Sequence, residues 1–138
     1  QRWLMLIIDA SVALKWALPE AGSDRARDLL VNEVLAAPEL LAIECANVLW
    51  AKARRKQISA ADAQGALAGI LAAPVTLLPS AAATAQAQNL ALALDHPAYD
   101  CLYLATAIAE RATLVTADET LVTAVIAHGG FGGGIRLL

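Results

Sequence analysis

Short apolar runs alternate along this chain with longer segments in which apolar residues recur every three or four positions. Such a run is typical of a buried strand, and the longer spacing is typical of an amphipathic helix. The runs predict strands over residues 4–9, 34–37, 75–78, 113–116 and 135–138. The helical spacing predicts helices over residues 12–18, 24–33, 38–56, 59–73, 80–94, 97–112 and 119–128.

Strands that alternate with helices are typical of an α/β fold. We therefore predict a single domain over residues 1–138, with a central, mostly parallel sheet of about four to five strands flanked by helices. The first run is apolar without interruption, which indicates a strand covered on both faces. Ligands of such sheets bind beyond the carboxyl ends of the strands. Asp9 and Asp118 follow two of the predicted strands, so we expect both at the same edge.

Polar residues and glycines indicate where several helices begin and end. Ser11 is placed to cap the first helix, which Pro19 ends. Ser59 is placed to cap a later helix, with Asp62 three residues on. The glycines between residues 129 and 134 predict a flexible turn before the last strand.

Composition narrows the class of protein. The chain is 59% hydrophobic, which is enough for a packed core and excludes a disordered chain. Its net charge is −3, so nucleic-acid binding would need a metal and a local basic patch to offset the acidic balance. The segment between Asp62 and Asp95 carries no charge, but prolines and polar residues interrupt it, so we expect no membrane span.

The two cysteines, Cys45 and Cys101, lie far apart and do not have the spacing of a zinc site. Each falls within a helical pattern, which favours a small buried thiol. Unpaired cysteines fit a protein of the reducing cytoplasm. The first apolar run is too short for a signal peptide.

Four acids lie where acids are costly or unusual. Asp9 and Asp118 follow apolar runs, whereas Glu44 and Asp100 interrupt the apolar stripe of predicted helices. A carboxylate in apolar surroundings must be paired, protonated or bound to a metal, and few cations lie near these positions. Taken singly, each has a structural explanation as a helix cap, a first-turn acid or a side chain that reaches water. Together they predict a site for Mg2+ or Mn2+, with Asn47 beside Glu44 on its helix.

The segments around these acids resemble PIN-domain ribonucleases of the VapC toxin type. The resemblance spans nearly the whole chain and is specific only as a set. It rests on Ile8-Asp9-Ala10-Ser11-Val12 with Lys15-Trp16, on Pro38-Glu39-Leu40 through Glu44 and Asn47, on Tyr99-Asp100 through Tyr103-Leu104-Ala105, and on Leu114-Val115-Thr116-Ala117-Asp118.

The resemblance implies a Mg2+-dependent endoribonuclease, the toxin of a type II toxin–antitoxin pair. It implies that the four acids hold the metal and that the hydroxyls of Ser11 and Thr116 shape the site. A metal-activated water would cleave RNA to a 5'-phosphate and a 3'-hydroxyl, and the implied partners are a small antitoxin and a second copy of the chain. Relatives often carry a further acid or an aromatic residue after the last Asp, which leaves open whether Glu119 joins the site.

Other function classes fit the acids less well. A phosphoacceptor receiver domain needs an acidic pair near the first strand, and an aspartyl-phosphate phosphatase needs an acid where Ser11 lies. A non-catalytic, PIN-like interaction domain stays open. The basic residues near the end of the third helix either bind RNA phosphates or complement the helix dipole; they are Lys52, Arg54, Arg55 and Lys56.

The histidines and tryptophans are not expected in the acidic site. His96 and His128 show no partner at catalytic spacing, so we expect capping or surface roles for both. The tryptophans Trp3, Trp16 and Trp50 are expected to pack against neighbours. Trp16 and Trp50 are also candidates for a groove that an antitoxin helix would fill.

Overall fold

Five parallel strands form one sheet in the order β3-β2-β1-β4-β5 in the computed structural model, which describes residues 4–130 and 134–138. The strands are β1 Met5–Ile8, β2 Val34–Pro38, β3 Val75–Leu78, β4 Thr113–Thr116 and β5 Gly134–Leu137. The predicted α/β class is confirmed, and the sheet is parallel throughout rather than mostly parallel.

The helices fall close to their predicted ranges. They are α1 Ala10–Ala17, α2 Ser23–Asn32, α3 Leu40–Arg54, α4 Ala60–Ala72, α5 Thr84–Leu94, α6 Ala98–Glu110 and α7 Glu119–Ala127, with a short 3-10 helix, η1 Ala81–Ala83, before α5. The 3-10 turn divides the segment that was predicted as one helix over residues 80–94. No helix in the described ranges is long and apolar enough to cross a membrane.

The helix ends confirm one expected cap and correct another. Ser59 accepts a hydrogen bond from the Asp62 backbone N–H at 2.9 Å, so it caps α4 as predicted. The expected cap at Ser11 is wrong, because Asp9 caps α1 and Ser11 already lies inside the helix. Trp3 and residues 131–133 of the predicted glycine turn lie outside the described residues; Gly129 and Gly130, at the start of the turn, have φ of +87° and +80° after α7.

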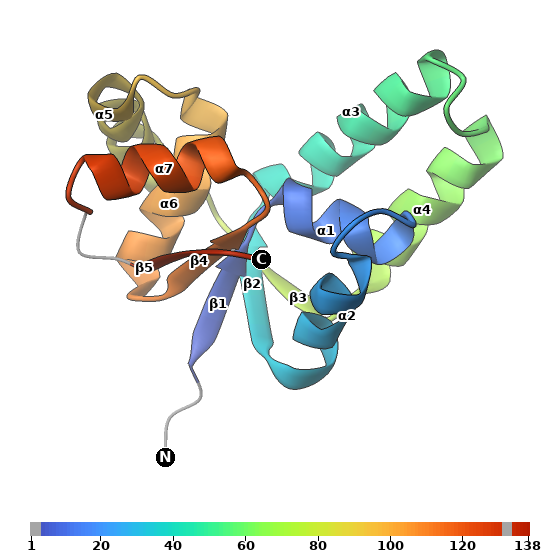
Figure 1. The fold of residues 1–138 in the computed structure, drawn as a ribbon, viewed down its shortest axis with the longest axis horizontal. Helices are drawn as coiled ribbons and strands as arrows, with labels where there is room; N and C mark the ends of the chain where they lie inside the picture. Colours follow the sequence, from blue (N-terminus) through green and yellow to red (C-terminus); the bar gives the residue numbers. More distant parts are fainter. Residues whose placement is uncertain (1–3, 131–133) are drawn as a thin grey trace.

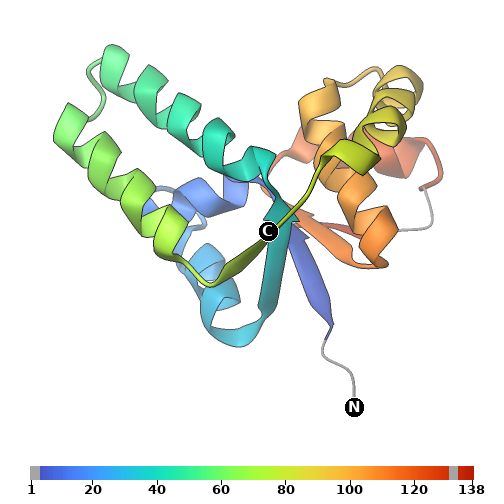
Figure 2. The ribbon, with the colours of Figure 1, turned by 180° about the vertical axis from the view of Figure 1, so that it is seen from behind.

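The helices divide into two groups about the sheet. Figures 1 and 2 show α1 to α4 on one side and α5 to α7 on the other, with α3 and α4 projecting together away from the strands. Helix α6 packs across β1, β2, β4 and β5, and α1 lies against α2, α3 and α4. Both faces of β1 are therefore covered, as its uninterrupted apolar sequence predicts.

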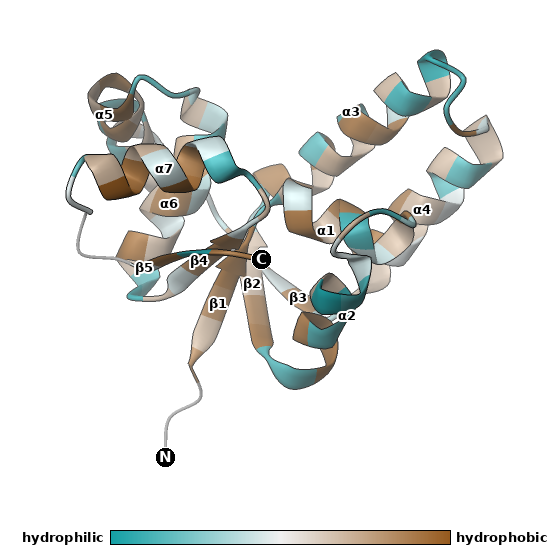
Figure 3. Cartoon of the chain, in the orientation of Figure 1, coloured by the Kyte–Doolittle hydropathy of each residue, from teal (hydrophilic) through white to brown (hydrophobic). Residues whose placement is uncertain are grey.

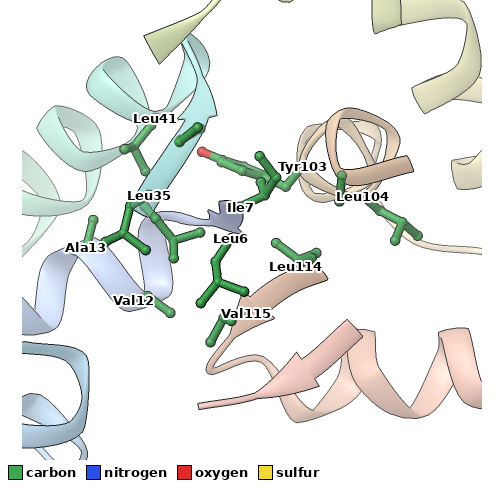
Figure 4. Close-up of a cluster of buried hydrophobic side chains, with 14 of the residues drawn as sticks. Leu6, Ile7, Val12, Ala13, Leu35, Leu41, Tyr103, Leu104, Leu114 and Val115 are labelled. Atoms are coloured by element: carbon green, nitrogen blue, oxygen red, sulfur yellow. The ribbon is translucent and has the colours of Figure 1, made fainter. Parts of the chain in front are cut away.

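The core is centred on β1 and β4, the middle of the sheet. Ile7, Ile8, Leu114 and Val115 have no exposed surface. Figure 4 shows core side chains from these strands, from α1 and from α6 converging, with the ring of Tyr103 reaching in from α6. In Figure 3, β1, β2 and β4 at the middle of the sheet are largely brown, while teal polar segments lie along the helices and in the connections between elements. Full burial of one such side chain stabilises the fold by about 1.5–3 kcal/mol.

The order of the strands fixes where a site is expected. The chain runs from β1 outward to β2 and β3 and then returns across the sheet to β4, so the direction of winding reverses between β1 and β4. Ligands of open α/β sheets bind in the crevice at such a switch point, beyond the carboxyl ends of the strands. Asp9 follows β1 and Asp118 follows β4 at this position. The prediction that they share one edge is confirmed.

A candidate metal centre at the sheet switch point

Asp9 lies at the centre of the hydrogen-bond network beyond β1. Its side chain is 8% exposed and caps α1 by accepting a bond from the Val12 backbone N–H at 3.3 Å. The hydroxyls of Ser11 and Thr116 donate to its two carboxylate oxygens, each at 2.5 Å. Both oxygens of a buried carboxylate are therefore held in place by side chains from two different strand ends.

Burial raises the pKa of Asp9 above its usual value of 3.8. The hydrogen bonds from Ser11, Thr116 and Val12 oppose this rise, and the negative charge of Asp100 adds to it. No lysine or arginine forms an ion pair with Asp9 within the described ranges. This buried acid therefore lacks a protein cation that would stabilise its charge.

The same hydroxyls tie the end of β1 to the end of β4. The Ser11 hydroxyl oxygen accepts the Ala117 backbone N–H at 2.9 Å, and that of Thr116 accepts the Asp118 backbone N–H at 3.1 Å. Thr116 has no exposed surface. Both hydroxyls contact Asp9 directly. The site-shaping roles of Ser11 and Thr116 stay predictions.

Asp118 caps α7 and also faces the site. Its Oδ1 accepts the backbone N–H groups of Thr120 at 3.0 Å and Leu121 at 3.2 Å, so the capping explanation holds for one oxygen. Its Oδ2 lies 3.7 Å from His96 Nε2. One carboxylate thus satisfies a helix end with one oxygen and directs the other toward the neighbouring acids.

Glu44 approaches the site from α3 and is held by a tyrosine of α6. The Tyr103 hydroxyl donates a short hydrogen bond to Glu44 Oε1, although the residues lie 59 positions apart. Burial raises the pKa of Glu44, the bond from Tyr103 opposes the rise, and the charges of Asp100 and Asp9 add to it. Burial and the contact with Glu44 also raise the pKa of Tyr103, which stays a neutral donor.

Asp100 completes the acidic set through a histidine that was not expected in the site. His96 Nε2 lies 2.9 Å from Asp100 Oδ2, and the side chain of His96 is only 10% exposed. The expectation of a capping or surface role is therefore wrong for His96. The available signal was its position four residues before Asp100, but His96 precedes α6, so helical spacing alone did not predict the contact.

His96, Asp100 and Asp118 each offer one donor atom, and these atoms all lie within 4.8 Å of one another. Asp100 raises the pKa of both Asp9 and Glu44 through its charge, so these acids are electrostatically coupled. Among residues 4–130 and 134–138, no lysine or arginine forms an ion pair with these carboxylates, and one imidazole joins two of them. Such a group has the donor chemistry of a divalent-metal site.

Two other candidate site residues, Asn47 and Glu119, lie outside this hydrogen-bond network of the described residues. Asn47 makes no hydrogen bond to Glu44 in the described part of the chain; both residues line a surface pocket of about 600 Å³. Glu119 is exposed in the first turn of α7, and it forms no ion pair among the described residues.

The cysteines are buried and free, as predicted. Burial, reinforced by the charges of Glu44 and Asp9, raises the pKa of Cys45 to about 12. Burial and the charge of Asp100 raise the pKa of Cys101 to about 11. Both thiols are therefore protonated at neutral pH.

Two features on the side of α1 to α4 bear on partners. The cations at the end of α3 lie on the surface, and the Arg54 guanidinium stacks on the ring of Trp50 at 5.6 Å. Trp50 is 56% exposed, so it is not buried in the core as a packing residue is expected to be. Trp16 donates its indole N–H to the Ala26 carbonyl at 2.9 Å and lines an apolar groove of about 830 Å³ between α1 and α4.

The sequence is similar to curated ribonucleases over most of its length. Residues 6–125 match the family described as PIN domain. The VapC ribonuclease Mb0985 of Mycobacterium bovis is 35% identical over 117 residues, which cover 85% of this chain and 88% of that protein. The ribonuclease VapC9 of Mycobacterium tuberculosis matches with the same identity and coverage.

Solved structures share the fold at lower identity. PAE2754 from Pyrobaculum aerophilum superposes with a TM-score of 0.73 at 22% identity, over 96% of this chain and 83% of that one. VapC20 of Mycobacterium tuberculosis, described as a sarcin-ricin loop cleaving toxin, gives 0.68 at 17% identity, over 92% of this chain and 97% of that one. VapBC2 from Rickettsia felis, bound to a DNA fragment from its promoter, gives 0.67 at 18% identity, over 97% and 98% of the two chains. These likenesses confirm the PIN-like fold.

Proposed function

The chain belongs to the PIN domain family, and from this premise we propose that it is a metal-dependent endoribonuclease, the toxin of a type II toxin–antitoxin pair. Relatives at 35% identity are named ribonucleases, which supports the activity. The observation that carries the proposal is the unbroken series of contacts from Asp9 through Thr116, Asp118 and His96 to Asp100 at the switch point of the sheet.

The residues at this point fit a divalent metal. Asp9, Glu44, Asp100 and Asp118 would hold it, with Mg2+ as the cofactor and Mn2+ as a substitute. Asp9 in particular is a buried acid with a raised pKa and no lysine or arginine paired with it in the described part of the chain. When bound, the metal would lower the pKa of an attacking water and stabilise charge on the scissile phosphate.

The protein's own groups then have distinct tasks. Ser11 and Thr116 fix both oxygens of Asp9, so this carboxylate keeps one orientation. Tyr103 holds Glu44 through Oε1, which leaves Oε2 to accept the proton of the water. Attack of the water oxygen would form a new bond to phosphorus and break the bond to the 3' oxygen. That oxygen would take a proton from solvent, so the products are a 5'-phosphate and a 3'-hydroxyl.

The alternative of a non-catalytic interaction domain is not favoured. A domain without chemistry has no need to bury Asp9 and half-bury Glu44 beside one another, because each buried charge costs stability. The curated relatives are also named for ribonuclease activity.

Cleavage of RNA by the purified chain tests the proposed activity. Without its partner, the protein should cut a pool of structured RNA at discrete sites in Mg2+ or Mn2+, and EDTA should stop the reaction. An Asp100→Asn preparation, purified in parallel, controls for contaminating nucleases. Cleavage that persists in EDTA, or that is equal in the Asp100→Asn preparation, would refute the proposal.

For partners, we propose a small antitoxin, a second copy of the chain, and a site of action in the cytoplasm, where such RNA is found. The apolar groove lined by Trp16, Leu30 and Ile70 suits the apolar face of an antitoxin helix. The uncharged segment exposes one leucine on each side of the sheet, Leu71 of α4 (56%) and Leu92 of α5 (77%), and a second copy of the chain would cover apolar surface of this kind. Light scattering that shows a clean monomer at high concentration would refute the homodimer.

A further inference from the structure

His96 occupies a position that a capping or surface histidine does not need. Its side chain is 10% exposed, and its Nε2 atom is directed between the carboxylates of Asp100 and Asp118 at 2.9 and 3.7 Å. Asp95, which ends α5 with a left-handed φ of +52°, turns the chain so that the His96 backbone N–H bonds to the Ala91 carbonyl. The imidazole is thus placed by the backbone of the turn and not only by its contact with Asp100.

The spacing of the donor atoms suits a shared ion. Two ligands that bind one divalent ion side by side, each at about 2.1 Å, lie about 3 Å apart. The separation of His96 Nε2 from Asp100 Oδ2 is already 2.9 Å, and the donor atoms of His96, Asp100 and Asp118 lie within 4.8 Å of one another. An ion at this point would need a small shift of side chains at most, and it would replace the hydrogen bond between His96 and Asp100.

From this geometry we infer that His96 is a nitrogen ligand of the metal site, which is therefore a mixed site of carboxylate oxygens and one imidazole. The inference rests on the proposed metal-dependent function and deepens it. It also changes the expected selectivity. All-oxygen sites suit Mg2+, whereas an imidazole ligand favours transition ions, with affinity rising from Mn2+ through Co2+ to Ni2+. His96 therefore biases this site toward Mn2+ and Co2+ over Mg2+.

Electron spin-echo spectroscopy of bound Mn2+ tests the inference without any RNA. A directly bound imidazole nitrogen produces a 14N modulation in the echo, and carboxylate oxygens produce none. The tag-free parent chain in stoichiometric Mn2+ should show this modulation, and His96→Asn should lose it. Asn keeps a polar group near Asp100 but is a poor nitrogen ligand, so the variant preserves the surroundings of the site.

The chain supplies its own control, because it contains only two histidines. His128 follows α7 and is exposed, about 14 Å of helix from Asp118. The His128→Asn variant should keep the full 14N modulation. Far-UV circular dichroism checks that both variants fold, and His96→Gln serves as the second variant if His96→Asn does not.

Metal titration supplies an independent measure. Loss of the nitrogen ligand should weaken Mn2+ binding by about tenfold or more and weaken Mg2+ binding less, so the preference for Mn2+ falls. If Mn2+ binds without 14N modulation, or if His96→Asn leaves the preference unchanged, His96 is not a ligand, although the metal site stands. If the folded parent binds no Mn2+, both this inference and the proposed metal-dependent function are wrong.

Discussion

The candidate site has two halves that are held in different ways. The strand half consists of residues at or just beyond the ends of β1 and β4, namely Asp9, Ser11, Thr116 and Asp118. The helix half consists of residues on or beside α3 and α6, namely Glu44, His96, Asp100 and Tyr103. The first is a closed network in which side chains bond to backbone groups as well as to one another. The second depends on two side-chain contacts, Tyr103 to Glu44 and His96 to Asp100.

We therefore expect the strand half of the site to be rigid and the helix half to be adaptable. Neighbouring parallel strands fix the distance between Asp9 and Thr116, because β1 and β4 are hydrogen-bonded in register up to Ile8 and Val115. In the helix half, Glu44 lies on α3 and Asp100 on α6, and Glu44 is held by a side-chain hydrogen bond from Tyr103. We expect the strand half to determine the position of the metal and the helix half to adjust when metal and RNA bind.

The largest expected effect comes from Asp9→Asn, which removes the central charge and keeps the shape of the strand half. The rate of RNA cleavage should fall by more than about 100-fold. This loss is larger than the loss expected when a residue that only orients a metal ligand is replaced. In EDTA the variant should melt at the same temperature as the parent or higher, because the raised pKa of Asp9 means that its charge opposes folding. RNA cleavage and thermal melting measure the two effects.

The pH dependence of that comparison follows from the direction of the shift. A raised pKa means that the folded state binds the proton of Asp9 more tightly than the unfolded chain does. The charge therefore destabilises the metal-free parent at neutral pH, and the penalty shrinks as the pH falls toward 3.8, the unperturbed value. The gap in melting temperature between Asp9→Asn and the parent should close over this range. A gap that widens toward acid pH would show that the shift has the opposite sign.

Thr116→Val tests the strand half alone. The substitution keeps the volume but removes the hydroxyl that donates to Asp9 and accepts from the Asp118 backbone N–H. Because Thr116 is fully buried, we expect a loss of about 1–3 kcal/mol in the free energy of unfolding. Thr106→Val is the matched control, since that hydroxyl bonds to the Leu102 carbonyl within α6. If urea denaturation finds the same loss in the free energy of unfolding for Thr116→Val and Thr106→Val, the hydrogen bonds of Thr116 stabilise the fold no more than an ordinary bond within a helix.

Tyr103→Phe tests the helix half. Without the hydroxyl, the hydrogen bond that lowers the pKa of Glu44 is absent, so this pKa rises further. Metal binding should weaken by about tenfold at neutral pH, and the pH at which binding is half lost should move upward. Tyr99→Phe is the control, because Tyr99 is 67% exposed and the tyrosine that bonds to Glu44 is Tyr103. If titration calorimetry finds the same metal affinity for Tyr103→Phe and Tyr99→Phe, Tyr103 does not contribute to the metal site.

The smallest effect is expected outside both halves, at the cations that follow α3. Replacement of Arg55 and Lys56 by Gln should weaken RNA binding and lower the slope of log affinity against log salt by about 0.7 for each phosphate that the protein no longer neutralises. Metal binding should not change, since these side chains are exposed about 15 Å along α3 from Glu44. Filter binding at several salt concentrations measures the slope. An unchanged slope would mean that these cations do not bind RNA phosphates and interact only with the dipole of α3.

The sequence predicted the strand half better than the helix half for a physical reason. Apolar runs locate buried strands, and a parallel arrangement then places Asp9 and Asp118 at one edge without knowledge of any side-chain contact. The sequence offered both Asp9 and Ser11 as caps of the first helix and could not choose between them, because Asp and Ser are equally good caps. The structure assigns the cap to Asp9.

The helix half requires tertiary contacts that periodicity does not encode. The apolar stripes indicated that Glu44 and Asp100 face inward, but the bond from Tyr103 joins segments 59 residues apart. His96 was missed because it precedes α6, where helical spacing is not assured, and only the turn at Asp95 brings it over Asp100. The single domain over residues 1–138 and the catalytic roles of the acids stay predictions.

The central claim is that the two halves share one divalent metal, and the most direct test is a pair of melting curves without RNA. The parent chain should melt at a clearly higher temperature in excess Mg2+ than in EDTA, because an ion that binds only the folded state stabilises it. The Asp9→Asn and Asp100→Asn variants, one from each half, should both lose most of that increase. If Mg2+ raises the melting temperature of neither parent nor variants, or raises all three equally, these carboxylates do not form a metal site.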